Sequence, residues 1–153
     1  MAQIALKCRG VMGGRARGAA LVTSTPISFW GGVDPKRGLI IDKRSESFGR
    51  SITRKIFVFP YGRGSSTSSA VFLEIIRRNK APAAIVNVET EPLLAVGAII
   101  AERLYGKSIP IVDQVQANPC EVIRSDDWVE VDADNGIIRV VRDGRNRPYS
   151  VTP

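Results

Sequence analysis

The chain of 153 residues contains no histidine, and this absence removes several kinds of chemistry. A histidine general base, a histidine metal ligand and a phosphohistidine carrier are excluded within the chain itself. Only two cysteines are present, Cys8 and Cys120, and they are far apart in the sequence. Because neither belongs to a Cys-x-x-Cys pair, we expect no zinc or iron–sulfur site built from this chain alone. We expect two buried free thiols in a reduced compartment.

Long hydrophobic runs are also missing, because no apolar segment approaches the roughly 20 residues that a membrane-spanning helix needs. The segment Met1–Lys7 enters a strand-like pattern at once, so we expect no signal peptide, no membrane partner and a cytoplasmic protein. The length predicts one domain, residues 1–141, followed by a loose polar C-terminal tail, residues 142–153.

The net charge of +7, from 22 Lys and Arg against 15 Asp and Glu, permits nucleic acid, an acidic partner or an anionic substrate. The basic residues are spread along the chain in loose groups such as Lys43-Arg44, without a long basic run. Aromatic residues do not alternate with a basic stripe either. We therefore expect no nucleic-acid partner, and the charge leaves an acidic partner or an anionic substrate.

The most informative stretch is a short apolar run followed by a glycine-flanked arginine and five hydroxyl residues. Lys55–Phe59 predicts a buried strand, and the apolar spacing from Val71 predicts a helix that ends near Asn79. Between them, Gly62-Arg63-Gly64 permits a sharp turn and a close approach of the backbone to a ligand. The five residues Ser65–Ser69 supply several candidate helix N-caps.

Such a junction is suited to binding an anion. The free N–H groups of the first helical turn and the positive end of the helix dipole would face a ligand near Gly64 and Ser65. Arg63 would add a two-pronged contact to a carboxylate or phosphate. The structural alternative is that the serines only cap the helix. The stretch is not a P-loop, which needs Gly-Lys-Ser/Thr, and not a Gly-x-Ser-x-Gly nucleophile elbow.

The rest of the chain predicts an α/β fold with a small parallel core sheet, two main helices and a β-rich end. Lys43–Arg54 is expected to be a loop, and Phe29-Trp30 is expected to close one end of the core. A functional interpretation is compatible with this core-closing role. In it, the Gly31-Gly32 backbone and Asp34 line the same cleft as Arg63 and Ser65. The other expected elements are a helix over Leu93–Leu104 and extended segments over Ile4–Lys7, Ala19–Thr23, Leu39–Ile41, Ala84–Val88, Ile109–Asp113, Pro119–Arg124, Trp128–Val131 and Ile137–Val141.

Three stretches together resemble a known family. They are Pro26–Pro35, which contains Phe-Trp-Gly-Gly-Val-Asp-Pro; Gly62–Ser66, which reads Gly-Arg-Gly-Ser-Ser; and Ala81–Ile85, followed by Gly97–Ala101. In combination they resemble the small, swivelling subunit of the aconitase X family, over about residues 3 to 141. The resemblance implies a swivelling β/β/α domain like the mobile domain of aconitase.

The resemblance also implies a function. The active enzyme would be a hydro-lyase in which a large aconitase-like subunit carries an iron–sulfur cluster or iron, while this chain binds no cofactor alone. The substrate would be a small hydroxy acid. The family's proton-accepting serine maps onto Ser65. We further expect Arg63 to bind the substrate carboxylate, and Gly64 and Ser66 to make backbone contacts.

The serine run and the Phe-Trp pair resemble bacterial members, which dehydrate cis-3-hydroxy-L-proline, more than archaeal ones, which dehydrate mevalonate 5-phosphate. The alternatives are therefore a phosphomevalonate dehydratase small subunit or a non-catalytic metabolite-binding swivel domain. The chain departs from the family at about Ser45, where members often carry a histidine shortly after the Ile-Asp that corresponds to Ile41-Asp42.

Overall fold

The computed structural model describes residues 2–63 and 66–142. The helices in these ranges are α1 (Phe29–Gly32), α2 (Ser66–Arg77), α3 (Pro92–Tyr105) and α4 (Pro119–Val122). The strands are β1 (Ala2–Lys7), β2 (Arg9–Met12), β3 (Arg15–Val22), β4 (Val33–Asp34), β5 (Leu39–Ile40), β6 (Ile56–Phe59), β7 (Ala84–Asn87), β8 (Ile111–Asp113), β9 (Trp128–Asp132) and β10 (Ile137–Arg142). Within these ranges, none of the helices has the length and apolar character needed to cross a membrane.

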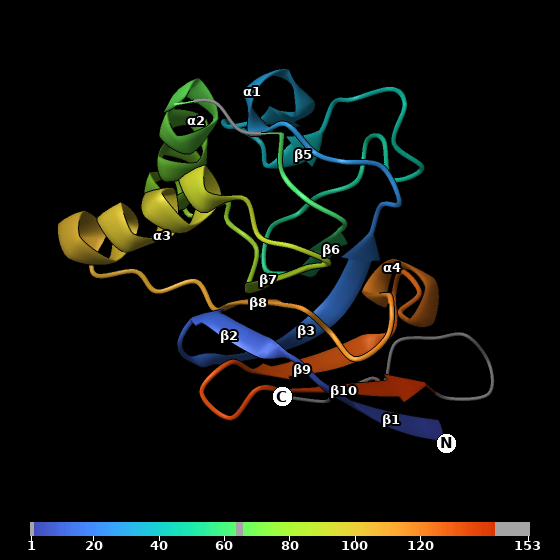
Figure 1. The fold of residues 1–153 in the computed structure, drawn as a ribbon. Helices are drawn as coiled ribbons and strands as arrows, with labels where there is room; N and C mark the ends of the chain where they lie inside the picture. Colours follow the sequence, from blue (N-terminus) through green and yellow to red (C-terminus); the bar gives the residue numbers. More distant parts are fainter. Residues whose placement is uncertain (1, 64–65, 143–153) are drawn as a thin grey trace.

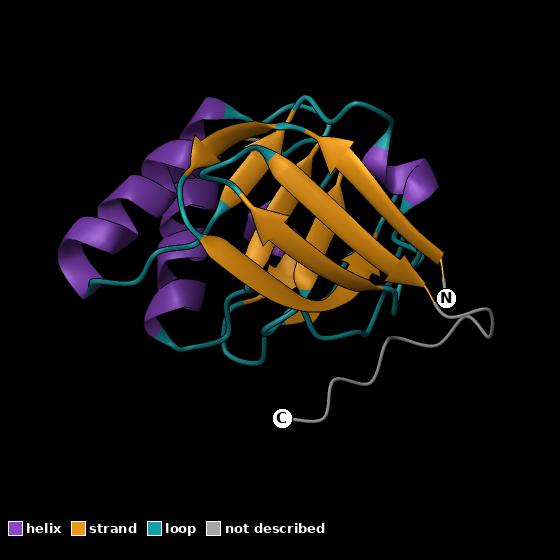
Figure 2. Cartoon of the chain, turned by 90° about the horizontal axis from the view of Figure 1, so that it is seen from below, coloured by secondary structure: helices purple, strands orange, loops and turns teal. Residues whose placement is uncertain are grey.

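Eight strands form one sheet in the order β1-β10-β9-β3-β6-β7-β8-β2. The chain crosses from one edge of this order to the other through a single residue, Cys8, because β1 and β2 follow each other directly. The sheet must therefore curl so that its two edges approach. Figure 2 shows the strands wrapping around one end of the molecule, with the α2 and α3 helices on one side.

Strand β3 joins the two halves of the sheet. Its first part, Arg15–Ala19, pairs antiparallel with β9, and its last part, Ala20–Val22, pairs parallel with β6. Parallel pairing continues from β6 to β7 and from β7 to β8. The loops after β3, β6 and β7 therefore leave the sheet at its carboxyl edge, where ligands commonly bind in parallel sheets.

The burial of each strand follows its position. In β9 and β10 buried side chains alternate with partly exposed ones, as expected for a sheet with one face toward the core. All four residues of β6 and of β7 are buried, because these strands are covered on both faces. Alternate residues of the parallel strands therefore enter two hydrophobic cores.

One core lies between the parallel strands and the helices, and it contains Leu21, Phe57, Phe59, Phe72 and Leu94 among others. The other lies between the parallel strands and the antiparallel half, and it contains Val22, Val58, Val86, Val129 and Val140 among others. Helices α2 and α3 lie side by side over the first core (Figure 1). The α/β fold with a parallel core, two main helices and a β-rich end is confirmed.

Several expectations for single elements need correction. The segment expected to be extended at Pro119–Arg124 begins with α4, because the Asn118 side chain caps the N–H of Cys120 and Pro119 occupies the first helical turn. Strand β2 was not expected from the sequence. Phe29 is buried as expected, but Trp30 is 64% exposed, because the chain turns at Gly31 with φ of 81°. Strand β10 includes Arg142, and residues 143–153 of the expected tail lie outside the described residues.

Candidate functional site

The candidate site lies where β6 leads into α2. Beyond β6 the backbone of Gly62 forms a parallel bridge with Ile27. The N–H of Arg63 donates to the carbonyl of Ile27 at 2.8 Å, and the N–H of Ile27 donates to the carbonyl of Tyr61 at 3.2 Å. These bonds hold the Gly62-Arg63 backbone against the segment that precedes α1. The loop is therefore fixed by a neighbouring strand-like segment up to Arg63.

The serines of α2 have structural partners. The Ser69 hydroxyl donates to the carbonyl of Leu93 at 2.8 Å, which ties the start of α2 to the start of α3. The Ser68 hydroxyl lies 3.4 Å from both the carbonyl of Arg63 and the hydroxyl of Ser28. Ser68 and Ser69 thus have structural roles, but they lie inside α2 and bond to carbonyl groups instead of capping the helix as the structural alternative expected.

The four expected site residues are described to different extents. Arg63 is described, and its side chain is exposed at the end of the loop. Gly64 and Ser65 lie outside the described residues. Ser66 is the first residue of α2, and only its backbone is described. The roles expected for Ser65, Gly64 and Ser66 therefore stay predictions.

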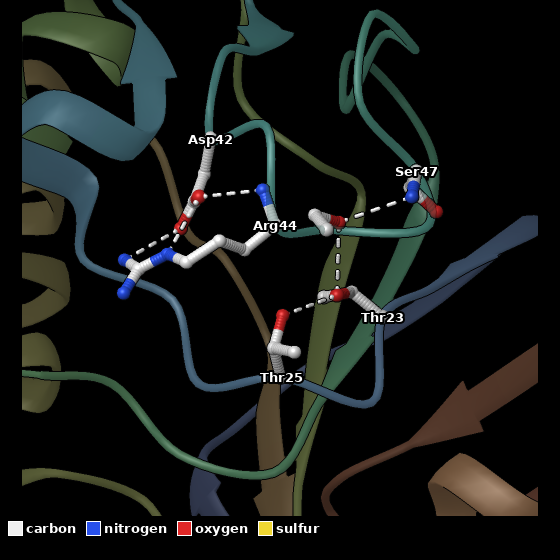
Figure 3. Close-up of polar contacts among 6 residues, drawn as sticks. Thr23, Thr25, Asp42, Arg44 and Ser47 are labelled. Carbon is white, nitrogen blue, oxygen red and sulfur yellow. Dashed lines mark hydrogen bonds and ion pairs between the residues drawn. The ribbon is translucent and has the colours of Figure 1, made fainter.

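A second arginine, Arg44, lies at the same end of the molecule. Its Nε and Nη2 atoms each donate to a different oxygen of Asp42 at 3.1 Å, and its backbone N–H donates to Asp42 Oδ1 at 3.0 Å (Figure 3). Hydrogen bonds from the Arg44 side chain and backbone lower the pKa of Asp42 against the effect of partial burial, and the charges of Arg44 and Arg63 lower it further. Asp42 is therefore ionised at neutral pH and lies within the electrostatic reach of both arginines.

Sequence reasoning placed Arg44 only in a loose basic group. A signal was present, because an Asp-x-Arg sequence directly after a short strand can close on itself through an Asx-type turn. Asp34, which the functional interpretation placed in the cleft of Arg63 and Ser65, is engaged with its own loop. Its carboxylate accepts from the Lys36 N–H at 2.9 Å and from Arg37 Nε at 2.7 Å.

A chain of buried hydroxyl groups lies beneath Arg44. The Ser45 hydroxyl donates to Thr23 Oγ1 at 2.9 Å, and Thr23 Oγ1 lies 3.0 Å from Thr25 Oγ1. The backbone N–H of Ser47 donates to Ser45 Oγ at 3.0 Å, and the Ser47 hydroxyl donates to the carbonyl of Val22 at 2.7 Å. Figure 3 shows this chain joining the end of β3 to the loop after β5. Ser45, which was expected to lie at about the place of the family histidine, is buried and belongs to this network.

The two cysteines are free as expected, but each is only half-buried, and neither offers a reactive thiolate. Burial raises the pKa of both Cys8 and Cys120 to about 11, so the two thiols are protonated at neutral pH. Within residues 2–63 and 66–142, no three or more Cys, Asp or Glu side chains are grouped to hold a metal ion. The described side chains of this chain thus do not fit an iron centre, and its location in a partner subunit stays a prediction.

A hollow of about 300 Å³ opens beside the loop. It is lined by Tyr61, Gly62, Glu89, Thr90, Glu91 and Pro92. Glu91 is the N-cap of α3 and accepts from the N–H groups of Leu93 and Leu94, at 3.0 and 3.3 Å. Because its carboxylate already serves the helix, we assign Glu91 a structural role, and the positive charge of the site rests on Arg63 and Arg44.

Comparison with known proteins gives consistent matches. The family model described as aconitase X swivel domain matches residues 5–140. The phosphomevalonate dehydratase small subunit of Methanosarcina acetivorans is 41% identical over 142 residues, which cover 93% of this chain and 94% of that protein. The small subunit of the same name from Thermococcus kodakarensis is 42% identical over 139 residues, covering 91% and 98%.

A solved structure is also similar. The crystal structure of Thermococcus kodakaraensis aconitase X in its holo-form superposes with a TM-score of 0.81 and 40% sequence identity. The superposition covers 91% of this chain and 99% of the matched chain. The similarity therefore extends over the whole domain and includes the strand–loop–helix unit of the candidate site.

Proposed function

The chain belongs to the aconitase X swivel domain family, and on that premise we propose that it is the small subunit of a hydro-lyase that dehydrates phosphomevalonate. The observation that carries this proposal is an identity of about 40% over more than nine-tenths of both chains. The relatives concerned are named phosphomevalonate dehydratase small subunit. This supports the alternative substrate of the sequence analysis over cis-3-hydroxy-L-proline.

Some of the features that favoured hydroxyproline have structural explanations in this protein. Two serines of the long run, Ser68 and Ser69, bond to the loop and to α3. Phe29 packs against Phe72 with ring centroids 5.0 Å apart, inside the core. These three side chains serve the structure of the domain, so they carry little information about the substrate. The other member of the Phe-Trp pair, Trp30, is exposed and has no such explanation.

The proposed reaction removes a proton from one carbon of the substrate and hydroxide from the next. We assign the removal of this proton to Ser65, which directly precedes the first residue of α2 in the sequence. A serine is a weak base, so its alkoxide needs stabilisation by positive charge, and the start of a helix and a nearby guanidinium both supply it. Arg63 would bind the carboxylate of the substrate, and the backbones of Gly64 and Ser66 would contact it.

The leaving-group side of the reaction is assigned to a larger subunit. The name small subunit, carried by the relatives, implies such a partner for those proteins. For this chain we propose the same pairing, with the iron centre expected from the family in the large subunit. Because the described residues of this chain do not hold that centre, the roles assigned to this chain are limited to proton removal and substrate binding.

The experiment is reconstitution of this chain with the aconitase-like large subunit of the same organism. Phosphomevalonate and cis-3-hydroxy-L-proline are incubated in turn with the complex and with this chain alone, and loss of one water is followed by mass spectrometry. The proposal expects dehydration of phosphomevalonate by the complex only. Dehydration of hydroxyproline with phosphomevalonate unchanged would overturn the substrate. Metabolite binding without turnover of either compound would favour a non-catalytic swivel domain.

A further inference from the structure

We propose that Arg44 forms a second anion-binding site of this domain, separate from Arg63, and that it binds the phosphate group of the substrate. This inference rests on the proposed function, since it gives the phosphate a receptor within the small subunit. The observation behind it is that Arg44 is an exposed arginine whose orientation is fixed by Asp42 (Figure 3). The charge of Arg63 also acts on Asp42, which links the two arginines.

The orientation of Arg44 is fixed by Asp42. The carboxylate accepts hydrogen bonds from Nε and Nη2 of the guanidinium, and the Asp42 side chain is only 13% exposed. A guanidinium carries five N–H donors, so this contact leaves three, including both on Nη1. The Arg44 side chain is itself 74% exposed, and these donors can therefore reach a ligand without displacing a described side chain. This pairing orients the guanidinium before a ligand arrives, which reduces the cost of binding.

The backbone on both sides of Arg44 is also anchored. The N–H of Ile41 donates to the carbonyl of Gly32 at 2.9 Å, and the N–H of Gly49 donates to the carbonyl of Ile40 at 2.8 Å. The next residue along, Ser45, belongs to the buried hydroxyl chain. Residue 46 is a glutamate whose carboxylate accepts from both the N–H and the hydroxyl of Ser24. A loop held at so many points keeps the arginine in place.

Two arginines act on the Asp42 carboxylate. The groups that act on Asp42 are Arg44, on its own loop, and Arg63, from the loop before α2. A phosphomevalonate molecule carries a carboxylate and a phosphate, and the phosphate holds about −1.5 to −2 charges at pH 7. Because the carboxylate is assigned to Arg63, we assign the phosphate to Arg44. The remaining N–H donors of Arg44 suit an oxyanion that accepts several hydrogen bonds.

The test uses the reconstituted complex and three variants of this chain. Arg44→Ala removes the charge, and Arg44→Lys keeps the charge but removes the planar set of guanidinium donors. Arg37→Lys is the matched control. Arg37 is a similarly exposed arginine paired with an aspartate, since its Nε lies 2.7 Å from Asp34. The measured quantities are KM and kcat for phosphomevalonate, and the inhibition constants of inorganic phosphate and of mevalonate, which has the carboxylate but no phosphate.

We expect Arg44→Ala to raise KM for phosphomevalonate about 10- to 100-fold and Arg44→Lys to raise it about 10-fold, with a smaller change in kcat. The inhibition constant of inorganic phosphate should rise with KM, while that of mevalonate should stay unchanged. Arg37→Lys should behave as wild type. A merely structural role for Arg44 would weaken phosphate and mevalonate alike.

Three results overturn the inference. They are an unchanged KM in both Arg44 variants, an equal loss of affinity for phosphate and mevalonate, and an effect of Arg37→Lys as large as that of Arg44→Lys. If the wild-type complex fails to dehydrate phosphomevalonate, the proposed function fails and this inference fails with it. If the wild-type complex is active and the Arg44 variants match it, only the inference fails.

Discussion

Arg9 on β2 and Asp113 on β8 are joined by two parallel hydrogen bonds, from Nε to Oδ1 and from Nη2 to Oδ2, each 2.8 Å long. The Arg9 side chain is 54% exposed, whereas the Asp113 side chain is fully buried. The same carboxylate accepts the backbone N–H of Thr90 at 2.9 Å. This pair therefore fastens the edge strand β2 to the parallel sheet and to the segment that leads into α3.

The pair predicts an unusual pH dependence for Arg9→Gln. Burial alone raises the pKa of Asp113, but hydrogen bonds from Arg9 and Thr90 outweigh it and bring this pKa below its ordinary value. In the wild type, the stabilisation by the ionised carboxylate is present above the ordinary carboxyl pKa of about 4 and is lost as the pH falls through the lower, folded-state value. Without Arg9, burial raises the folded-state pKa instead.

The free energy of unfolding of Arg9→Gln should therefore lie furthest below that of wild type at neutral pH, and the gap should shrink as the pH falls from 7 toward 3. Urea unfolding of the two proteins across this range measures the gap. Arg37→Gln, in an exposed pair, is the control and should show almost no gap at any pH. A gap for Arg9→Gln that is the same at pH 7 and pH 3 contradicts the assignment to Asp113.

Gly10 allows β2 to pass close to the strand connection at Ala133. A Cβ atom at Gly10 would lie 2.2 Å from the carbonyl oxygen of Ala133, whereas one at Gly32 would meet nothing within 4 Å. Gly10→Ala should lower the free energy of unfolding by about 1–3 kcal/mol through overpacking. Gly32→Ala should change it by less than about 0.5 kcal/mol. Chemical denaturation checks both, and equal stabilities would refute the close contact.

Adjacent aromatic residues should differ sharply in their effect on stability. The Phe29 ring packs against those of Phe57, Phe59 and Phe72, so Phe29→Ala should cost about 3–5 kcal/mol. Trp30→Ala removes a mostly exposed side chain and should cost less than about 0.5 kcal/mol in the isolated chain. Thermal unfolding monitored by circular dichroism compares the two variants. Similar losses in both would mean that Trp30 is packed in solution.

The buried hydroxyl chain should contribute to stability through Ser45. Ser45→Ala removes the acceptor of the Ser47 N–H and the donor to Thr23, leaving buried polar groups unsatisfied. We expect a loss of about 1–3 kcal/mol in the free energy of unfolding. The control Ser108→Ala, at an exposed position, should lose less than about 0.5 kcal/mol. If Ser45→Ala is as stable as its control, the network carries no stability.

Local signals in the sequence account for the best predictions. The strand–loop–helix around Arg63 was expected because strand, glycines and helix follow one another within one stretch. The ends of α3 were expected for the same reason, since Glu91-Pro92 starts the helix and Gly106, with φ of 65°, ends it. The three stretches of family resemblance identified the family, which the match over residues 5–140 confirms.

The missed features depend on contacts between distant parts of the chain. Strand β2 has four partly or fully exposed residues, and it exists because it pairs with β8 about a hundred residues later. The exposure of Trp30 beside the buried Phe29 depends on a turn that the sequence does not specify alone. The pairing of Arg44 with Asp42 is local, but its position near Arg63 follows from the tertiary fold. The helix α4 was missed although Asn118-Pro119 is a local start signal.

The central claim is that this chain supplies the proton-accepting residue of a two-subunit dehydratase. Its most direct test is the turnover of phosphomevalonate by the complex containing Ser65→Ala, with Thr67→Ala on the exposed side of α2 as the control. The account predicts that Ser65→Ala assembles with the large subunit normally but loses at least about 100-fold in kcat, while Thr67→Ala keeps wild-type activity. Wild-type turnover by Ser65→Ala would contradict it.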